Sequence, residues 1–261
     1  AIPQNIDDLD DLLDAGVLGL KAFTIESGID EFPEVNAEHL KQVMRKIGKY
    51  KLPLLVHAEL RDNYTEPNVL QTKPIGKSYS RFLASRPKRW ENNAIKLLIA
   101  LASSNNDEGI FTKLHIVHLS SSDALSLIRE GKDKGLCISA ETCPHYLNLF
   151  SEAIPDGNCI FKCCPPIRDS ENREHLWNGL ADGTIDFIVS DHSPSPPELK
   201  QLESGDLENA WGGISSLQFG LPLSWTEAKN RGFGLSKVVE WITINPAKYC
   251  GLGKLKGRLA P

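Results

Sequence analysis

The sequence predicts an α/β fold of the (β/α)8 TIM-barrel class, of which about five strands are present. Strand-like apolar runs alternate with segments of helical period. The long irregular segments directly follow predicted strand ends, where β/α barrels carry their functional loops. The first strand is not followed by the glycine-rich turn that a doubly wound nucleotide-binding sheet would favour. These observations favour a barrel over an open sheet.

The predicted elements repeat in the order strand, helix, strand, which is typical of parallel β/α structure. Short apolar or β-branched runs predict strands at 17–24, 54–56, 114–119, 137–141 and 187–190. Helix-period apolar spacing predicts helices at 37–47, 90–103, 123–129, 173–180 and 235–242. Residues 61–88 and 192–211 are the longest segments that we expect to be irregular.

An eight-stranded barrel needs three more strands than the five that the sequence predicts. We therefore expect residues 1–261 to be a partial catalytic barrel, about strands four to eight, whose earlier part lies before Ala1. A length of 261 residues with 41% hydrophobic residues can bury a substantial core.

Charge and composition exclude several kinds of partner. The net charge is −5, and the 29 basic residues are dispersed, so we expect no nucleic-acid partner. No apolar run is long enough to cross a bilayer, and we expect no membrane partner. The six cysteines include no CxxC pair, and we interpret them as reduced core thiols. A small-molecule substrate is favoured.

Polar residues end three of the predicted strands. His57, His118 and Asp191 offer the imidazole and carboxylate groups that zinc and similar ions prefer. A single histidine is more often a packed core or loop residue, but three coincident strand-end positions favour metal ligands. His115 and His118 are three residues apart and should point to opposite faces of a strand, so we choose His118, which is nearer the strand end.

Lys21 lies inside an otherwise apolar predicted strand, where an ammonium group is costly to bury unless it is paired or loses its proton. A neutral lysine can react with carbon dioxide to give a carbamate, a carboxylate that can bridge two metal ions. The alternative is an ordinary ion pair. The residues alone favour the ion pair.

A series of motifs in a fixed order resembles the cyclic amidohydrolases, the group that contains allantoinase, dihydropyrimidinase or hydantoinase, and dihydroorotase. The chain is most similar to the allantoinase members. The motifs span nearly the whole chain: Gly19-Leu20-Lys21-Ala22-Phe23, Ile25-Glu26-Ser27-Gly28, Val56-His57-Ala58-Glu59, Ser85-Arg86-Pro87, His115-Ile116-Val117-His118, Glu141-Thr142-Cys143-Pro144-His145, Lys162-Cys163-Cys164-Pro165-Pro166, Ser190-Asp191-His192-Ser193-Pro194, Trp211-Gly212-Gly213-Ile214 and Asn245-Pro246-Ala247.

The resemblance implies a site with two divalent metal ions, expected to be zinc, bridged by a carboxylated Lys21. His57, His118 and Asp191 would be further ligands, and Asp191 would also be the catalytic base and acid. Cys164, Gly212 and Gly213 are implied as substrate-binding residues, although a packed cysteine and a turn are the plain alternatives. His145 and His192 are expected to support the site or the fold and not to bind metal.

The implied reaction is hydrolysis of the ring amide of allantoin to give allantoate, a step of purine degradation. Residues 24–27 lack the tyrosine that dihydropyrimidinases use near this point, which favours allantoin. Hydrolysis of a dihydropyrimidine, hydantoin or dihydroorotate is the alternative, and a non-catalytic assembly protein is the non-enzyme alternative. Retention of all four candidate ligands favours an enzyme.

The chain departs from the family pattern in lacking a His-x-His pair. Its histidines are at 39, 57, 115, 118, 145, 175 and 192, and no two are two residues apart. We expect that pair before Ala1, and the small β-sandwich domain of the family to be missing as well. A homo-oligomer in the cytoplasm is expected. The endoplasmic reticulum is the alternative. Asn63-Tyr64-Thr65 matches a glycosylation pattern that occurs often by chance and would matter only in a secretory compartment.

Overall fold

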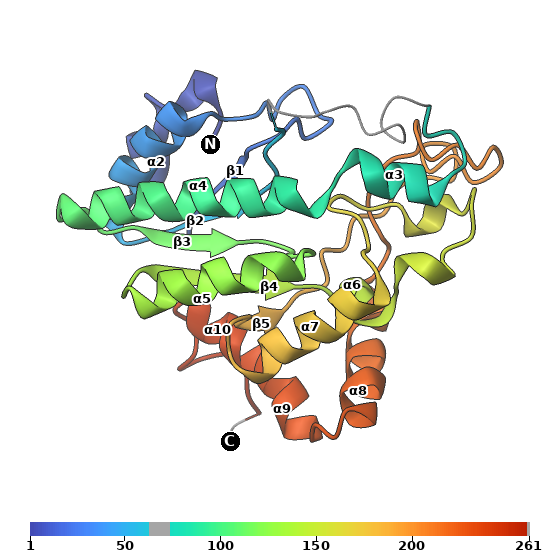
Figure 1. The fold of residues 1–261 in the computed structure, drawn as a ribbon. Coiled ribbons are helices and arrows are strands. Elements are labelled where there is room, and N and C mark those ends of the chain that lie inside the picture. The colour runs from blue at the N-terminus through green and yellow to red at the C-terminus, as the bar shows by residue number, and fades with distance from the viewer. Residues whose placement is uncertain (63–73, 260–261) are drawn as a thin grey trace. The chain divides into compact units, whose positions relative to one another are not determined.

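A computed structural model of the chain describes residues 1–62 and 74–259, which form two compact units (Figure 1). The first comprises Ala1–Asn63, Arg89–Val117 and Asp123–Ala140. The second comprises Tyr64–Lys88, His118–Ser122 and Glu141–Pro261. The glycosylation pattern at 63–65 lies outside the described residues.

Parallel strands in chain order form the sheet of the first unit. Its ladders join β1 to β2, β2 to β3 and β3 to the beginning of β4. In Figure 1, α4 runs along β2 and β3. The elements are η1 (Pro3–Asn5), α1 (Leu9–Asp14), β1 (Leu20–Phe23), α2 (Ala37–Tyr50), β2 (Pro53–His57), α4 (Lys88–Asp107), β3 (Lys113–Ile116), η2 (Ser122–Ala124), α5 (Leu125–Asp133) and β4 (Cys137–Thr142).

The two faces of this sheet differ in chemistry because successive side chains of a strand alternate. One face is apolar: the register aligns Leu20, Leu54 and Leu114 in one row, and all three are at most 4% exposed. The opposite face carries the polar side chains of Lys21 and His115. The register places both in one row, on either side of Leu55. The candidate ligands of this unit therefore lie on the face away from the apolar rows.

Helix α2 shows how local sequence sets an element. The Asn36 side chain accepts a hydrogen bond from the backbone nitrogen of His39 at 2.9 Å and caps the first turn. The helix ends where Lys51 takes a left-handed φ of 56°. Its predicted apolar face is confirmed, because Leu40, Val43, Met44 and Ile47 have no exposed surface.

The first described helix of the second unit is α3, and the unit contains the end of β4, which pairs in parallel with β5. Helix α7 is capped by Asp169, whose side chain accepts from the backbone nitrogen of Asn172 at 2.8 Å. The remaining elements are α3 (Tyr79–Ser85), α6 (Pro144–Asn148), η3 (Ser151–Ala153), η4 (Cys159–Phe161), α7 (Ser170–Ala181), β5 (Phe187–Ile188), η5 (Leu217–Phe219), α8 (Gly220–Asn230), α9 (Leu235–Val239), η6 (Glu240–Ile244) and α10 (Asn245–Tyr249).

The five predicted strands and the helices between them are confirmed, and the strands are parallel and in chain order. Two expectations are wrong. The segment 61–88 is not irregular throughout, because Tyr79–Ser85 is a helix that buries Tyr79 and Phe82. None of the six cysteines forms a disulfide in the described residues, but Cys137 and Cys250 are exposed and are not core thiols.

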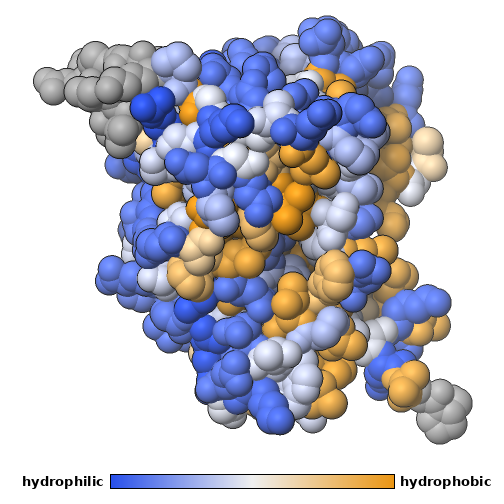
Figure 2. Space-filling model, turned by 90° about the vertical axis from the view of Figure 1, so that its right-hand side faces the viewer, coloured by the Kyte–Doolittle hydropathy of each residue, from blue (hydrophilic) through white to orange (hydrophobic). Residues whose placement is uncertain are grey.

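Apolar side chains reach the surface of the second unit. Leu217, Phe219 and Leu221, on η5 and the start of α8, are 66%, 49% and 51% exposed. Figure 2 views the molecule from the right-hand side of Figure 1, where α8 lies, and shows orange apolar side chains among the blue ones. Among the described residues, no helix has both the length and the apolarity required to span a membrane.

Candidate metal centre

Two predicted ligands of the first unit, Lys21 and His57, lie on the same face of neighbouring strands. The register pairs Lys21 with Leu55 and Phe23 with His57. The Lys21 Nζ lies 4.9 Å from the centroid of the Phe23 ring, which lies 5.4 Å from that of His57. Lys21 is exposed within residues 1–62 and 74–259, which cover only the other face of β1.

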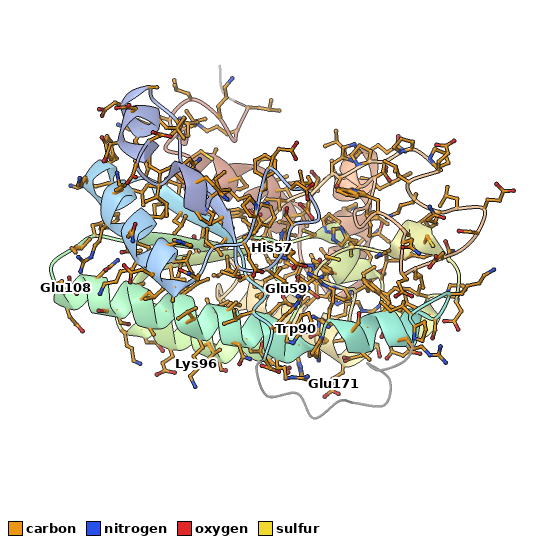
Figure 3. The ribbon with its side chains drawn as sticks, turned by 90° about the horizontal axis from the view of Figure 1, so that it is seen from above. His57, Glu59, Trp90, Lys96, Glu108 and Glu171 are labelled. Carbon is orange, nitrogen blue, oxygen red and sulfur yellow. The ribbon has the colours of Figure 1, made fainter. Side chains whose placement is uncertain are left out.

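His57 is held by a carboxylate that the sequence argument passed over. Its Nε2 lies 2.7 Å from Oε2 of Glu59, which has no exposed surface. Glu59 is fixed in turn, because its backbone nitrogen donates to the Thr24 hydroxyl at 3.1 Å. That hydroxyl also lies 3.0 Å from the carbonyl oxygen of His57. Figure 3 shows His57 and Glu59 close together, near Trp90 at the start of α4.

Such a pair can orient a metal ligand. A carboxylate that binds one ring nitrogen fixes the tautomer and the plane of the ring and directs the other nitrogen to the metal. In His57 that other atom is Nδ1. The signal in the sequence is the His-x-Glu spacing at the end of β2.

His115 lies on the face of Lys21 and His57 and has no exposed surface. Its Nδ1 lies 2.7 Å from the Ser139 hydroxyl. Strand alternation does not distinguish His115 from His118, because β3 ends at Ile116 and His118 has a left-handed φ of 40°. Alternation holds only within an extended strand.

His118 and Asp191, in the second unit, share this unusual backbone conformation. Their φ angles are 40° and 44°, a region that residues other than glycine seldom adopt and that often marks functional positions. The segment that carries His118 is bound to β4: the Leu119 nitrogen donates to Glu141 O at 2.7 Å, and the Thr142 hydroxyl donates to Leu119 O at 2.8 Å.

The turn that carries Asp191 is held on both sides by Ser216. The Ser216 hydroxyl donates to the carbonyl of Ser190, and its backbone nitrogen donates to Nδ1 of His192 at 3.1 Å. The Leu217 nitrogen donates to the same Nδ1 at 3.2 Å. His192 therefore has the structural role that was expected of it, and Asp191 is fixed between two anchored neighbours.

The three predicted substrate-binding residues lie close together in the second unit. A Cβ on Gly212 would lie 3.3 Å from the Cys164 sulfur. A Cβ on Gly213 would lie 2.5 Å from the Ser193 hydroxyl oxygen, and this glycine has a φ of 145°. Only glycine fits at position 213, because any side chain there would prevent the close approach of this backbone to Ser193.

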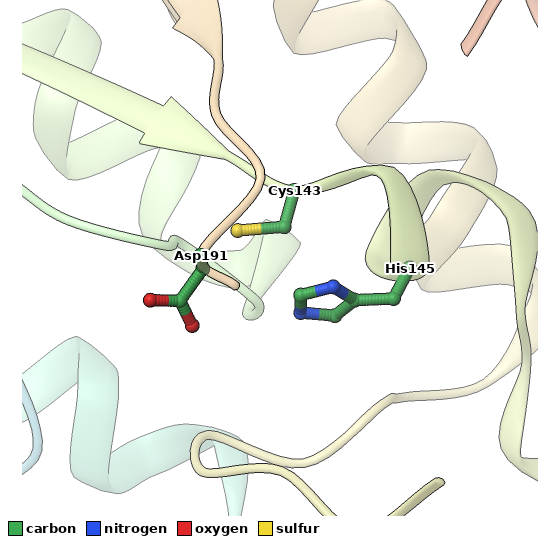
Figure 4. Close-up of side chains that lie close together, drawn as sticks. All are labelled: Cys143, His145 and Asp191. Atoms are coloured by element: carbon green, nitrogen blue, oxygen red, sulfur yellow. The ribbon is translucent and has the colours of Figure 1, made fainter. Parts of the chain in front are cut away.

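Asp191 also belongs to a cluster that the sequence argument did not predict. Ligand atoms of Cys143, His145 and Asp191 all lie within 4.8 Å of one another, and Figure 4 shows the three side chains together. His145 is 3% exposed, and burial lowers its pKa to about 3, so that it is neutral. Among the described residues, this is the group of His, Cys, Asp and Glu side chains placed to hold a metal ion.

His145 borders a cavity of about 350 Å³ within the second unit. Lys200 lies in its wall, and its Nζ donates to the carbonyls of Lys162 at 2.8 Å and Trp211 at 2.9 Å, and also to that of Gly213. Burial is the main cause that lowers the pKa of Lys200 to about 8. This lysine binds together the loops that carry Gly213.

Comparison with known proteins decides the family. The model of the amidohydrolase family matches residues 7–261. The chain belongs to the amidohydrolase family. Amidohydrolases of this family are metal-dependent and generally bind two metal ions. The imidazole and carboxylate groups of His57, His118 and Asp191 are of the kinds that zinc and similar ions bind.

The amidohydrolase chain is similar to proteins named allantoinase. It is 48% identical to the allantoinase of Streptomyces avermitilis over 97% of this chain and 54% of that protein. It is 47% identical to the allantoinase of Arabidopsis thaliana over 94% of this chain and 48% of that protein. The chain thus spans about half the length of the curated relatives it matches.

A solved structure shows the same fold. The L-hydantoinase (dihydropyrimidinase) of Arthrobacter aurescens matches 99% of this amidohydrolase chain and 56% of its own, with a TM-score of 0.85 and 29% identity. The prediction of part of a β/α barrel is thereby confirmed.

Proposed function

We propose that residues 1–261 form a partial catalytic barrel of a cyclic amidohydrolase that opens the ring of allantoin to give allantoate. The choice of substrate rests on sequence identity, which is higher to proteins named allantoinase than to a hydantoinase. The chain is 48% and 47% identical to two allantoinases and 29% identical to an L-hydantoinase. One family model covers almost the whole chain, which supports a single domain.

We assign Lys21, His57, His118 and Asp191 as ligands of two divalent ions, with zinc as the preferred metal and Lys21 as a carbamate. The donor set fits, since it provides two imidazoles and two carboxylates when Lys21 is carboxylated. The orientation of His57 by Glu59 and the left-handed backbone at His118 and Asp191 support the assignment.

Two bound divalent ions would supply an acidified water and polarise the ring carbonyl of the substrate. Asp191 would accept the proton of that water on a carboxylate oxygen and deliver it to the amide nitrogen that leaves, so that one group is base and then acid. Its backbone is restrained through Ser190 and His192. Restraint keeps the carboxylate in place for both transfers. Cys164, Gly212 and Gly213 are proposed to contact the substrate.

Hydantoins and dihydropyrimidines are the second class of substrate, supported by the similarity to the L-hydantoinase structure. A non-catalytic assembly protein is less well supported, because all four candidate ligands are present in the sequence.

The test is ring opening by the full protein, supplied with zinc and bicarbonate, on allantoin, hydantoin, dihydrouracil and dihydroorotate. We expect the highest kcat/KM on allantoin. Faster turnover of dihydrouracil would overturn the choice of substrate, and inactivity on all four would overturn the enzyme proposal. Asp191→Asn should abolish turnover of the preferred substrate while the circular dichroism spectrum is retained.

A further inference from the structure

Two neighbouring side chains of the second unit, from one short segment, face the carboxylate of Asp191. Cys143 directly follows β4, His145 is the second residue of α6, and both are buried. Figure 4 shows the Cys143 sulfur and the His145 ring directed toward the Asp191 side chain, which comes from the segment after β5. A sulfur, an imidazole nitrogen and a carboxylate oxygen thus meet within 4.8 Å.

The state of His145 points to a ligand. It is 3% exposed, and within the part of the chain that the structure describes neither of its ring nitrogens has a hydrogen-bond partner. Its ring packs against Tyr146 at a centroid distance of 4.3 Å, a contact that uses the carbon skeleton and not the nitrogens. Buried polar atoms are normally paired, so two unpaired nitrogens on one buried ring call for a partner.

The spacing suits a metal ion. Zinc binds sulfur at about 2.3 Å and imidazole nitrogen or carboxylate oxygen at about 2.0–2.2 Å, so its tetrahedral ligand atoms lie roughly 3.3–3.8 Å apart. Small rotations of the three side chains would bring atoms within 4.8 Å to that separation. A thiolate favours soft or borderline cations over magnesium or calcium.

We propose that Cys143, His145 and Asp191 form a binding site for a thiophilic divalent cation, Zn²⁺ or Cd²⁺. The thiol of Cys143 loses its proton to solvent when the metal–sulfur bond forms, and the imidazole binds through a lone pair. Three protein ligands leave the fourth position to water. His145 is then a ligand and not only a supporting residue.

A consequence rests on the proposed function. The site shares Asp191 with the proposed catalytic pair of ions, so a cation held by Cys143 and His145 would draw the carboxylate away from its role in proton transfer. Excess Zn²⁺ or Cd²⁺ should therefore inhibit ring opening, and Cys143→Ser should relieve that inhibition.

The site itself is tested without an activity assay, by titrating the full, zinc-loaded protein with Cd²⁺ and recording the ultraviolet charge-transfer band of the cadmium–thiolate bond. The exposed Cys137 and Cys250 are first replaced by serine to remove their thiols. We expect one thiolate-bound cadmium per chain in this background. Adding Cys143→Ser should abolish the band, and adding the matched Cys164→Ser should leave it unchanged.

His145→Leu should weaken Cd²⁺ binding by about tenfold or more. Removing a residue that only orients a ligand costs about this much, and removing a ligand should cost at least as much. Its metal-free thermal stability should not fall, because the change removes two unpaired buried nitrogens. Persistence of the band in Cys143→Ser, its loss in Cys164→Ser, or unchanged affinity in His145→Leu would overturn the site.

Cadmium NMR on the unaltered protein keeps the test independent of folding defects in the variants. A resonance in the range of mixed sulfur and nitrogen coordination supports the site, and one in the all-oxygen range contradicts it. If cadmium does not bind at Cys143 and His145 while allantoin is still hydrolysed, the proposed function stands. If the cadmium–thiolate band is lost only in Cys143→Ser but no cyclic amide is opened, only the proposed function is overturned.

Discussion

The Nε2 atom of His57 lies 2.7 Å from Oε2 of Glu59, a residue with no exposed surface. His57 is the last residue of β2, and Glu59 lies two residues beyond it. Thr24 on the neighbouring segment binds the backbone of both residues. This arrangement makes Glu59 a positioning residue for the proposed metal ligand.

Glu59→Gln should weaken metal binding by about 10- to 100-fold, as expected for removal of a carboxylate that orients a ligand. The amide is nearly the same size but lacks the negative charge that polarises the imidazole. Zinc affinity would be measured by competition with a chelator. The exposed Glu31→Gln is the control and should leave the affinity unchanged. Equal affinities in both variants would remove Glu59 from the site.

Gly213→Ala should destabilise the protein by about 1–3 kcal/mol, through backbone strain and overlap with Ser193. Gly212→Ala is the matched control, because its Cβ would meet the Cys164 sulfur at 3.3 Å and its φ is not in the left-handed region. Urea unfolding would give both values. A Gly213→Ala protein as stable as Gly212→Ala would contradict the packing described for this loop.

Asn172→Leu should cost about 2–4 kcal/mol of unfolding free energy, because it leaves buried backbone groups unpaired. The Asn172 side chain donates to Ser120 O at 2.8 Å and accepts from the Ser122 nitrogen at 2.9 Å. Asn178→Leu changes an exposed residue of the same helix and should cost much less. Chemical denaturation would compare them, and similar losses would argue against a special role for Asn172.

Lys200 should give stability a measurable pH dependence. Burial lowers its pKa to about 8 in the folded protein from the ordinary lysine value of 10.5, so the unfolded chain binds more protons between these values. The contribution of this group therefore favours folding increasingly as pH rises from about 8 to about 10.5. The difference in unfolding free energy between wild type and Lys200→Met should grow over this range.

The exposed Lys229→Met is the control for that experiment and should show a constant difference from wild type. Subtracting the unfolding free energy of the variant from that of the wild type removes the contributions of the other groups that titrate at high pH. A pH-independent difference for Lys200→Met would mean that folding does not lower the pKa of Lys200.

The strands and the helices between them could be predicted because their apolar patterns are local and periodic. The apolar rows through Leu20, Leu54 and Leu114 illustrate this, and so does the buried face of α2. Helix α3 was missed because it is short and lies in a segment without a clear period. Its stability comes from tertiary contacts such as the hydrogen bond of the Tyr79 hydroxyl to Ile167 O.

The site was only partly predictable, for a similar reason. Residue types at strand ends pointed to His57, His118 and Asp191, but the conformation of the backbone beyond a strand is set by long-range contacts. The φ angles of His118 and Asp191 could not be inferred from alternation. The meeting of Cys143 and His145 with Asp191, some 46 residues further along the chain, depends on the pairing of β4 with β5.

The central claim, that Lys21 and its partners hold the metal ions, is tested most directly by counting zinc in the full protein. The protein would be prepared with zinc and bicarbonate and then dialysed to remove weakly held metal, and elemental mass spectrometry would compare it with Lys21→Ala and Cys143→Ser. Because dialysis removes zinc bound only at the site of Cys143 and His145, we predict two zinc ions per chain in the wild type and in Cys143→Ser, and a loss of zinc in Lys21→Ala. Equal zinc content in Lys21→Ala and wild type, or no tightly held zinc in the wild type, would contradict the account.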